Sequence, residues 1–561
     1  MDFATIDIIV FVGYCLLIVG IGIYVSRDKK GHEKSAEDYF LAGKSLPWWA
    51  IGASLIAANI SAEQFIGMSG SGFALGLAIA SYEWMAAVTL LVVGKYFLPI
   101  FIEKGLYTIP EFVEKRYSTN LKTILAVFWI ALYVFVNLTS VMYLGAKALD
   151  TIIGTGDGSI MMTSVIGLAL FAAAYSLWGG LSAVAWTDVV QVVLLIIGGL
   201  VTTFIALDHL VPDGSAWDGL TYLYNKVPEK FSMILSQGEI ITPNGKDAWN
   251  DLPGLAVLVG GMWVANVYYW GFNQYIIQRT LAAKSLKESQ KGIVFAAALK
   301  LIIPLIVVIP GIIAFVMNSD ASGVVASGVA DPTFLNPEGG IINDNAAPWL
   351  IKSFVPVGLK GLVLAALAAA IVSSLASMLN STATIFTMDI YKPYINQNAT
   401  DKQTVNVGRL TAAVALVLAV FIAPALGNID QAFQFIQEYT GVVSPGILAV
   451  FLTGLFWKKA TNNAAIWGIL ISIPIALYFK VAPKGWSDAA MFIDWPFMHQ
   501  MLATCLISIA IILGISHLEG KGADDAKGIP LNKDLFKTSS TFNIGAMIVL
   551  IIIAFLYAFF W

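Results

Sequence analysis

The chain has 561 residues, a formal net charge of −4, 58% hydrophobic residues and only 12% charged residues. Soluble domains have roughly half apolar and roughly a quarter charged residues, so this composition excludes a water-facing globule. Apolar runs of about twenty residues, the length that crosses a hydrocarbon core, recur along the whole chain. They predict an all-α polytopic membrane protein.

About fourteen membrane-spanning helices are predicted from these runs. In chain order they cover residues 5–26, 47–72, 77–103, 121–149, 160–178, 184–207, 252–272, 291–317, 350–388, 404–426, 430–457, 461–482, 495–517 and 542–561. The first run is expected to be a retained helix, because acidic residues stand where a signal peptide has its positive region. The segment 350–388 is long for one crossing, and an interfacial helix is expected at its start.

The distribution of Lys and Arg predicts the orientation. With the N-terminus outside, about 22 of these residues fall on the inner side and about 8 on the outer side, as the positive-inside rule demands. An even number of helices then places both termini on the outer side. The long loops at about 208–251 and 318–349 become outer loops, and neither has the composition of a separate domain.

Two sets of five helices follow one another, at 47–207 and 252–457, and a polar stretch interrupts the first helix of each. These stretches are Ala57–Gln64, AANISAEQ, and Asn266–Gly271, NVYYWG. Two units of opposite topology, each opening with a broken helix, are typical of inverted-repeat transporters. The alternative is that the polar side chains only bond neighbouring helices together. Residues 1–46 would add one helix and an inner loop before the repeats, and residues 458–561 three helices after them.

Ionisable residues inside a membrane are costly and usually functional. The candidates within predicted spans are Glu63, Glu83, Lys95, Lys300 and Glu438. Lys300 lies well inside its helix and needs a partner, and Glu83 has the right sign. Either the two form a buried structural pair, or they line a hydrated cavity and bond a polar ligand. Carboxylates accept from hydroxyl groups and Lys donates, which suits a sugar.

The stretch Ala365–Thr387 is rich in small and hydroxyl side chains. Close helix packing is one use of such a composition. The other is a sodium site, because hard cations prefer oxygen ligands. The hydroxyl groups of Ser373 and Ser374, together with backbone carbonyls freed at a helix break near Asn59, would supply those oxygens.

Four segments carry a resemblance to a known family: Gly179–Asp188 (GGLSAVAWTD), Gln278–Lys284 (QRTLAAK), Ala58–Phe65 (ANISAEQF) and Ser373–Ser377 (SSLAS). Over almost its full length the chain resembles the sodium:solute symporter family, and within it the bacterial sodium/galactose (sodium/glucose-type) cotransporters. The resemblance implies a LeuT-type core of five-plus-five inverted repeats, with one helix before the core and three after it.

The resemblance also implies roles for individual residues. The sugar contacts would be Gln64, Glu83, Asn266, Lys300 and Gln437. The outer hydrophobic gate would be Met68, Tyr82 and Phe433. Tyr269 would stack under the sugar as the inner gate, with Trp270 beside it and Asn59 bonding the tyrosine. The sodium ligands would be the carbonyls of Ala57, Ile60 and Ala370 and the hydroxyls of Ser373 and Ser374. Asp188 would lie on the inner route of the ion.

Two positions depart from the relatives. Ala86 stands where a serine hydroxyl would contact the sugar, and a net hydrogen bond of about 1 kcal/mol is worth a several-fold change in binding. Ala376 lacks a hydroxyl that belongs to a second sodium site in some relatives, which favours one sodium per sugar.

The implied function is coupled inward movement of sodium and a monosaccharide of the galactose/glucose type by alternating access, in a bacterial inner membrane. The expected partners are the sugar, sodium and the lipid bilayer, with no nucleic acid. The alternatives are a sodium symporter for a non-sugar solute, a membrane enzyme, and a channel or ion-regulated sensor. A carboxylate solute would be repelled by Glu83, and no metal-ligand or nucleophile pattern supports an enzyme. The sequence leaves the preferred sugar and the oligomeric state open.

Overall fold

The computed structural model describes residues 4–27, 34–154, 158–319, 331–335, 340–426, 431–483 and 494–561. Across these residues all regular structure is helical, and strand-like pairing is limited to isolated bridges. In the described ranges, 11 helices are long and apolar enough to cross a membrane, or 12 with the pair Ala248–Val259 and Gly261–Phe272, which bends by 75°. The predicted all-α polytopic fold is confirmed, whereas length and apolarity alone give fewer crossings than the predicted number.

The helices are labelled α, and short 3-10 or π segments are labelled η. The first part of the chain forms α1 (Thr5–Ser26), α2 (Ala36–Leu41), η1 (Ala42–Lys44), α3 (Trp48–Asn59), η2 (Glu63–Met68), α4 (Ser69–Leu75), η3 (Leu77–Ala80), α5 (Ser81–Val92), η4 (Val93–Phe97), α6 (Leu98–Glu103), α7 (Ile109–Arg116), α8 (Thr119–Ala131), η5 (Leu132–Leu138), α9 (Thr139–Ile153) and α10 (Met161–Asp208).

The middle of the chain forms α11 (Ala216–Lys226), η6 (Pro228–Phe231), η7 (Ala248–Asn250), α12 (Leu255–Val259), α13 (Gly261–Phe272), α14 (Gln274–Leu281), α15 (Leu286–Val307), α16 (Ile309–Asn318), η8 (Pro332–Phe334), η9 (Asn343–Asn345) and α17 (Ala346–Phe354). The last part forms α18 (Leu359–Ile385), η10 (Phe386–Ile395), α19 (Asp401–Ile422), η11 (Ala423–Leu426), α20 (Ala432–Phe456), α21 (Asn462–Val481), α22 (Phe497–Gly520), η12 (Lys533–Phe536) and α23 (Ser540–Phe559).

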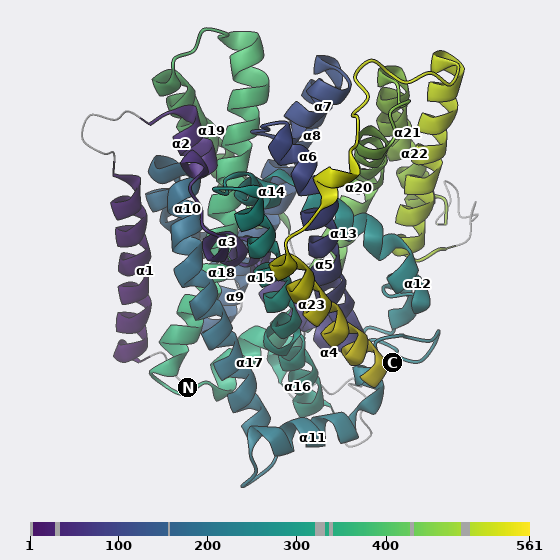
Figure 1. Ribbon diagram of the computed structural model, residues 1–561. Coiled ribbons are helices and arrows are strands. Elements are labelled where there is room, and N and C mark those ends of the chain that lie inside the picture. Colours follow the sequence, from purple (N-terminus) through teal and green to yellow (C-terminus); the bar gives the residue numbers. More distant parts are fainter. Residues whose placement is uncertain are drawn as a thin grey trace.

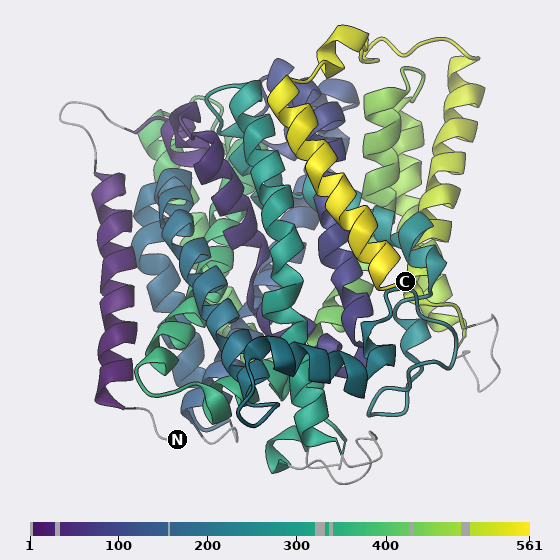
Figure 2. The same ribbon diagram turned by 60° about the horizontal axis from the view of Figure 1, so that its bottom comes forward.

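The helices form one bundle in which α18 is central and α1 and α23 are peripheral (Figures 1 and 2). Of the apolar stretch in Leu359–Ile395, 94% is buried, against 17% in α1 and 22% in α23. The free ends of α1 and α23 point toward the side of the bundle that carries α11, whereas α2 and α7 lie toward the opposite side (Figure 1). Lys29, Lys30 and Lys484, which entered the charge count, lie outside the described residues.

α10 runs over the two predicted segments 160–178 and 184–207, but it is not one straight helix. It counts 48 residues, and Gly180 inside it has φ 60° and ψ −154°. A side chain at this position would bring a Cβ within 2.3 Å of the Tyr39 carbonyl oxygen, so the break requires glycine. An unbroken helix of this length would extend about 72 Å, more than twice the hydrocarbon thickness. The glycine therefore divides α10 into two membrane-length pieces.

The long segment predicted at 350–388 is also divided, as expected. A short helix, α17, precedes the break, and α18 begins after Gly358. The carboxylate of Asp7 in α1 accepts hydrogen bonds from the amides of Gly358 at 2.8 Å and Gly361 at 2.7 Å. An acidic group at a helix N-terminus satisfies free amides and complements the helix dipole. Asp7 therefore fastens the peripheral α1 to the central helix.

Candidate functional site

The polar interruption predicted near Asn59 is a break in the helix. α3 ends at Asn59, and Ile60 has extended backbone angles, φ −77° and ψ 93°. The Gln64 side-chain oxygen accepts hydrogen bonds from the Ser61 amide at 3.0 Å and the Ser61 hydroxyl at 2.9 Å. In a continuous α-helix the Ser61 amide would bond to the carbonyl of Ala57. The break therefore releases that carbonyl for another partner.

The residues predicted to bind sodium come from two elements that touch at this break. The Ser374 hydroxyl of α18 donates to the carbonyl oxygen of Ala58 at 3.0 Å, which places α18 against the end of α3. Ala370 and Ser373 lie on the same side of α18, because positions three and four apart share a helix face. The five predicted ligands, all buried, are Ala57, Ile60, Ala370, Ser373 and Ser374. Neutral oxygens gathered at a break suit a hard cation.

Asp188 lies next to this cluster and is already engaged. Its carboxylate accepts from the hydroxyls of Ser373 at 2.6 Å and Ser54 at 2.5 Å, and it pairs with the Arg279 guanidinium at 3.3 Å. Arg279 also bonds the Ser54 carbonyl at 3.1 Å and the Ser377 hydroxyl. A fully buried ion pair needs such additional hydrogen bonds to offset desolvation. Arg279 lies in one of the segments that carry the family resemblance, but its partner was not predicted from the sequence.

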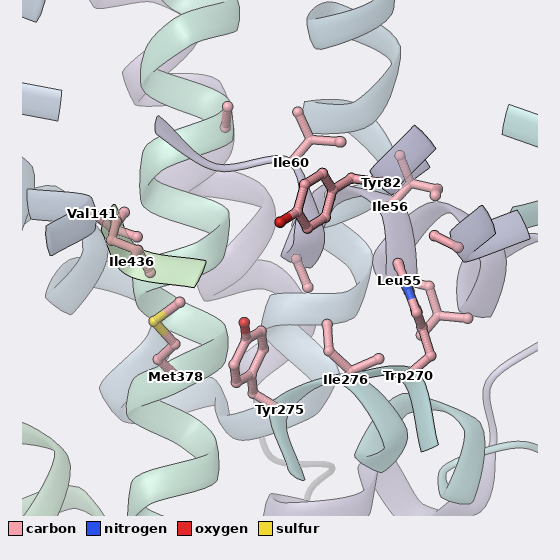
Figure 3. Close-up of a cluster of buried hydrophobic side chains, with 14 of the residues drawn as sticks. Leu55, Ile56, Ile60, Tyr82, Val141, Trp270, Tyr275, Ile276, Met378 and Ile436 are labelled. Atoms are coloured by element: carbon pink, nitrogen blue, oxygen red, sulfur yellow. The ribbon is translucent and has the colours of Figure 1, made fainter. Parts of the chain in front are cut away.

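A cavity of about 50 Å³, here called the central cavity, lies beside the break. Its walls come from α3, η2, α5, η5, α13, α15 and α20. The predicted residues that line it are Asn59, Gln64, Tyr82, Glu83, Ala86, Asn266, Tyr269, Trp270, Lys300, Phe433 and Gln437. All five predicted sugar contacts thus meet in one place, although they span most of the chain. Figure 3 labels Tyr82, Trp270 and Ile436, which line the central cavity, among the buried side chains that surround them.

Lys300 and Glu83 form the expected pair. The Lys300 ammonium bonds the Glu83 carboxylate and the side-chain oxygen of Asn59, and it lies 5.1 Å from the ring centre of Trp270. Asn59 in turn donates its amide nitrogen to the Tyr269 hydroxyl at 3.0 Å. Asn59, the last residue of α3, therefore connects the Lys300–Glu83 pair to Tyr269 in the wall of the cavity.

The residues predicted to form the outer gate pack closely together beside the central cavity. The rings of Tyr82 and Phe433 meet edge to face with centres 4.9 Å apart. A Cβ at Gly67 would lie 2.9 Å from the Phe433 amide, so η2 packs tightly on the start of α20, with Met68 fully buried beside it. Since one water needs about 10–15 Å³ of cavity volume, the cavity has room for a few waters and is too small for a hexose. Helix movement must accompany the entry of a ligand of that size.

Four polar residues in the cavity wall, Glu63, Asn137, Asn273 and Thr440, were missed as site residues by the sequence reasoning. Glu63 and Asn137 line the central cavity, and Glu63 Oε1 and Asn137 Oδ1 are buried without a hydrogen-bond partner in the described part of the chain, as is Asn266 Nδ2. Unpaired buried polar atoms are rare and costly, so unpaired atoms around a cavity are suited to a ligand. The signal was present, since Glu63 adjoins Gln64 and was noted as an ionisable residue.

The family model for the sodium:solute symporter family matches residues 39–472. The chain belongs to the sodium:solute symporter family. A sodium/glucose cotransporter of Vibrio parahaemolyticus is 59% identical over 556 residues, which cover 99% of this chain and 98% of that protein. Sodium/glucose cotransporter 4 of Mus musculus is 30% identical over 552 residues, which cover 93% of this chain and 76% of that protein.

A solved structure of a sodium-coupled sialic acid symporter in a substrate-bound, outward-open state superposes with a TM-score of 0.74 at 24% identity, covering 95% of this symporter and 100% of that chain. That likeness shows the fold. Family membership confirms the prediction of a sodium-coupled membrane transporter. It rules out a membrane enzyme, which was one of the alternatives. The roles of individual residues in the symporter stay predictions.

Proposed function

We propose that this symporter couples the inward movement of one sodium ion to the uptake of one monosaccharide of the galactose/glucose type by alternating access. The observation that carries the proposal is the junction at Asn59. There the broken end of α3 meets the hydroxyl groups of α18 on one side and bonds Lys300 and Tyr269 on the other. The high identity to a Vibrio sodium/glucose cotransporter supports the same assignment.

The chemistry of the central cavity favours a neutral polyol. Glu63 and Glu83 supply acceptors, Lys300 supplies donors, and the amides of Gln64 and Gln437 supply both. Each sugar hydroxyl needs a donor and an acceptor, which this mixture provides. A solute with its own carboxylate would face two carboxylates across a small, buried space, where like charges repel strongly. A neutral non-sugar solute remains the second candidate, and the transport assay below separates the two.

The proposed sodium ligands are the carbonyls of Ala57, Ile60 and Ala370 and the hydroxyls of Ser373 and Ser374. A hydroxyl oxygen that donates one hydrogen bond keeps lone pairs for a cation. The Ser374 hydroxyl donates to Ala58 and the Ser373 hydroxyl donates to Asp188, so both retain this capacity. Asp188 is occupied by Arg279 and two serines, and Ala376 offers no hydroxyl, which supports a single ion per cycle.

The coupling follows from the shared break. Sodium binding at the carbonyls fixes the end of α3, orients Gln64 and Met68, and favours the outward-open state. The sugar then binds, the Tyr82–Phe433 gate closes, and the helices rock inward. Sodium leaves past Asp188, Tyr269 releases the sugar, and the carrier resets. Each inward charge gains about 2.3 kcal/mol per 100 mV of membrane potential. That energy drives the sugar only if both ligands discriminate between the two states.

The proposed topology has about fourteen crossings with inverted repeats at 47–207 and 252–457, in a bacterial inner membrane with both termini outside. Dividing α10 at Gly180 adds one crossing to the apolar helices, and the broken segment α3–η2–α4 adds another. The free ends of α1 and α23 and helix α11, from a predicted outer loop, lie toward one side of the bundle, which supports this orientation (Figure 1).

Purified protein in liposomes tests the proposal. With sodium outside and potassium inside, labelled galactose or glucose is expected to accumulate above the external concentration, and replacing external sodium by potassium is expected to stop uptake. A panel of sugars, inositols, amino acids and carboxylates identifies the solute class. Sodium-driven accumulation of a non-sugar in the panel, without any sugar, would select the second candidate. Sugar flux that only equilibrates would exclude a coupled carrier.

A further inference from the structure

A second cavity, of about 470 Å³, lies between α1, α10 and α19, and it shares no residue with the central cavity. We call it the basic pocket. Its walls include Ile23, Ser26, Arg27, Lys34, Trp178 and Arg409. The three helices stand together at one edge of the bundle (Figure 1). The pocket lies at the end of α1 that is remote from the N-terminus, because Ile23, Ser26 and Arg27 line it.

The described lining of the basic pocket carries charged side chains of one sign only. Arg27, Lys34 and Arg409 contribute three cations, and its described lining contains no carboxylate. Within the described ranges, no ion pair joins Arg27 or Arg409 to an acidic side chain. Arg409 reaches the Trp178 carbonyl with one terminal nitrogen at 3.4 Å, while its Nε is buried without a hydrogen-bond partner. Charges of one sign around a cavity favour an anion inside it.

The position of the basic pocket is at the edge of the apolar belt. Arg27 directly follows the last residue of α1, and α1 turns most of its surface outward. Tyr24, near the same end of α1, is 72% exposed, and Trp178, which lines the pocket, is 62% exposed. Exposed tyrosine and tryptophan at a helix end mark the level of lipid headgroups. A ligand in this place can therefore hold a charged head in the pocket and an apolar part against α1 and Trp178.

We propose that the basic pocket binds the phosphate headgroup of an anionic phospholipid. The guanidinium groups of Arg27 and Arg409 would hold the phosphate oxygens, because the planar fork of arginine matches that geometry. The acyl chains would lie along Ile23 and the exposed ring of Trp178. Basic pockets between transmembrane helices are typical sites for such headgroups. The lipid would bridge α1 to α19 and hold the peripheral helix on the bundle. This assignment depends neither on the transported solute nor on the side of the membrane.

Native mass spectrometry of the detergent-purified protein tests the lipid. Phosphatidylglycerol and phosphatidylcholine with identical acyl chains are added in equal amounts. The wild-type protein is expected to retain phosphatidylglycerol, and Arg409→Gln and Arg27→Gln each to retain about tenfold less, since a hydrogen bond to a charged group is lost. Lys402→Gln, on α19 but outside the pocket, is the matched control and is expected to retain lipid normally. Equal retention of both lipids by the wild type would overturn the proposal.

A second measurement separates the lipid from a free anion. The melting temperature of the purified protein is followed with short-chain phosphatidylglycerol, with short-chain phosphatidylcholine and with inorganic phosphate, since a ligand that binds only the folded state raises it. Only phosphatidylglycerol is expected to do so, and Arg27→Gln is expected to reduce the shift. The same shift with inorganic phosphate would replace the lipid by a soluble anion and contradict the proposal. Arg27 is exposed at the end of α1, so its variant serves if Arg409→Gln fails to fold.

Discussion

Asn59 donates a hydrogen bond of 3.0 Å to the hydroxyl of Tyr269, and this contact ties the broken end of α3 to the floor of the central cavity. The side-chain oxygen of Asn59 accepts a hydrogen bond from the Lys300 ammonium. Asn59 therefore lies at the break that is proposed to hold sodium. It also contacts Tyr269 and Lys300, which are proposed to hold the sugar. We therefore propose that the coupling of the two ligands depends on this short connection rather than on a long path through the bundle.

Replacing Asn59 tests that connection. Asn59→Ala is expected to weaken the effect of sodium on sugar affinity, because the break and Tyr269 lose their direct link. Sugar binding measured at low and high sodium should differ much less in the variant than in the wild type. Asn137→Ala, which changes an amide on another wall of the cavity, is the comparison. If Asn59→Ala loses sugar affinity equally at both sodium concentrations, Asn59 binds sugar but does not couple the ligands.

The hydroxyl of Ser374 is expected to be needed for sodium. Ser374→Ala should reduce sodium-driven uptake at least about tenfold, because an oxygen ligand to a charged group is lost. Uptake is measured in liposomes against sodium concentration, and the melting temperature checks folding. Thr382→Ala is the matched control, since the Thr382 hydroxyl lies on the same helix and donates to the Met378 carbonyl at 2.8 Å, within its own helix. Sodium activation like that of the wild type in Ser374→Ala would refute the proposed site.

A double-mutant cycle on Lys300 and Glu83 separates a ligand-binding pair from a structural one. Lys300→Met and Glu83→Gln each leave a buried group without its partner, which costs up to about 4 kcal/mol of stability. The double variant should regain much of that stability, because neither charge remains. Sugar binding is nevertheless expected to stay weak in all three variants. Recovery of both stability and sugar affinity in the double variant would make the pair structural only.

Glu63 is expected to bind sugar, because it lines the central cavity and its Oε1 atom is buried with no hydrogen-bond partner among the described residues. Glu63→Ala should weaken sugar binding about tenfold, the effect of one hydrogen bond to a charged acceptor. The measurement is sugar affinity at saturating sodium, and Glu103→Gln, at the exposed end of α6, is the control. Unchanged affinity in Glu63→Ala would remove this residue from the site.

Ala86 offers a test by gain of function. The residue lines the central cavity on α5, one turn after Tyr82 and Glu83. Ala86→Ser adds a hydroxyl that can donate to or accept from a sugar hydroxyl, and a net hydrogen bond of about 1 kcal/mol corresponds to a several-fold gain. Sugar affinity of the variant should therefore rise, while sodium activation stays unchanged. Ala87→Ser, the next residue on α5, serves as the comparison because it does not line the cavity.

Much of the fold follows from apolar length and from helix-breaking residues. The division of α10 was predicted from two separate apolar runs, at residues 160–178 and 184–207, and the structure places the break between them, at Gly180. The role of Asp7 was not predicted. Its contact with Gly358 and Gly361 joins residues more than three hundred positions apart, and no local pattern encodes such a contact.

In the candidate site, too, some features were predicted from the sequence and others were not. The break at Asn59 and the pairing of Lys300 with Glu83 were predicted, because polar and charged residues inside an apolar span need a special environment. The partnership of Arg279 with Asp188 and the unpaired atoms of Glu63 and Asn137 were missed. Each depends on how helices pack side by side, and a single sequence states only that these residues are polar.

The reciprocal effect of sodium and sugar on each other's binding tests the central claim most directly. If one break in α3 serves both ligands, then sodium must raise sugar affinity by the same factor by which sugar raises sodium affinity. Equilibrium binding of galactose or glucose to the purified protein is measured in sodium and in potassium. We expect the sugar to bind at least about tenfold more tightly in sodium than in potassium, and this difference to be lost in Ser374→Ala. Equal sugar affinity in sodium and in potassium for the wild-type protein would contradict the central claim.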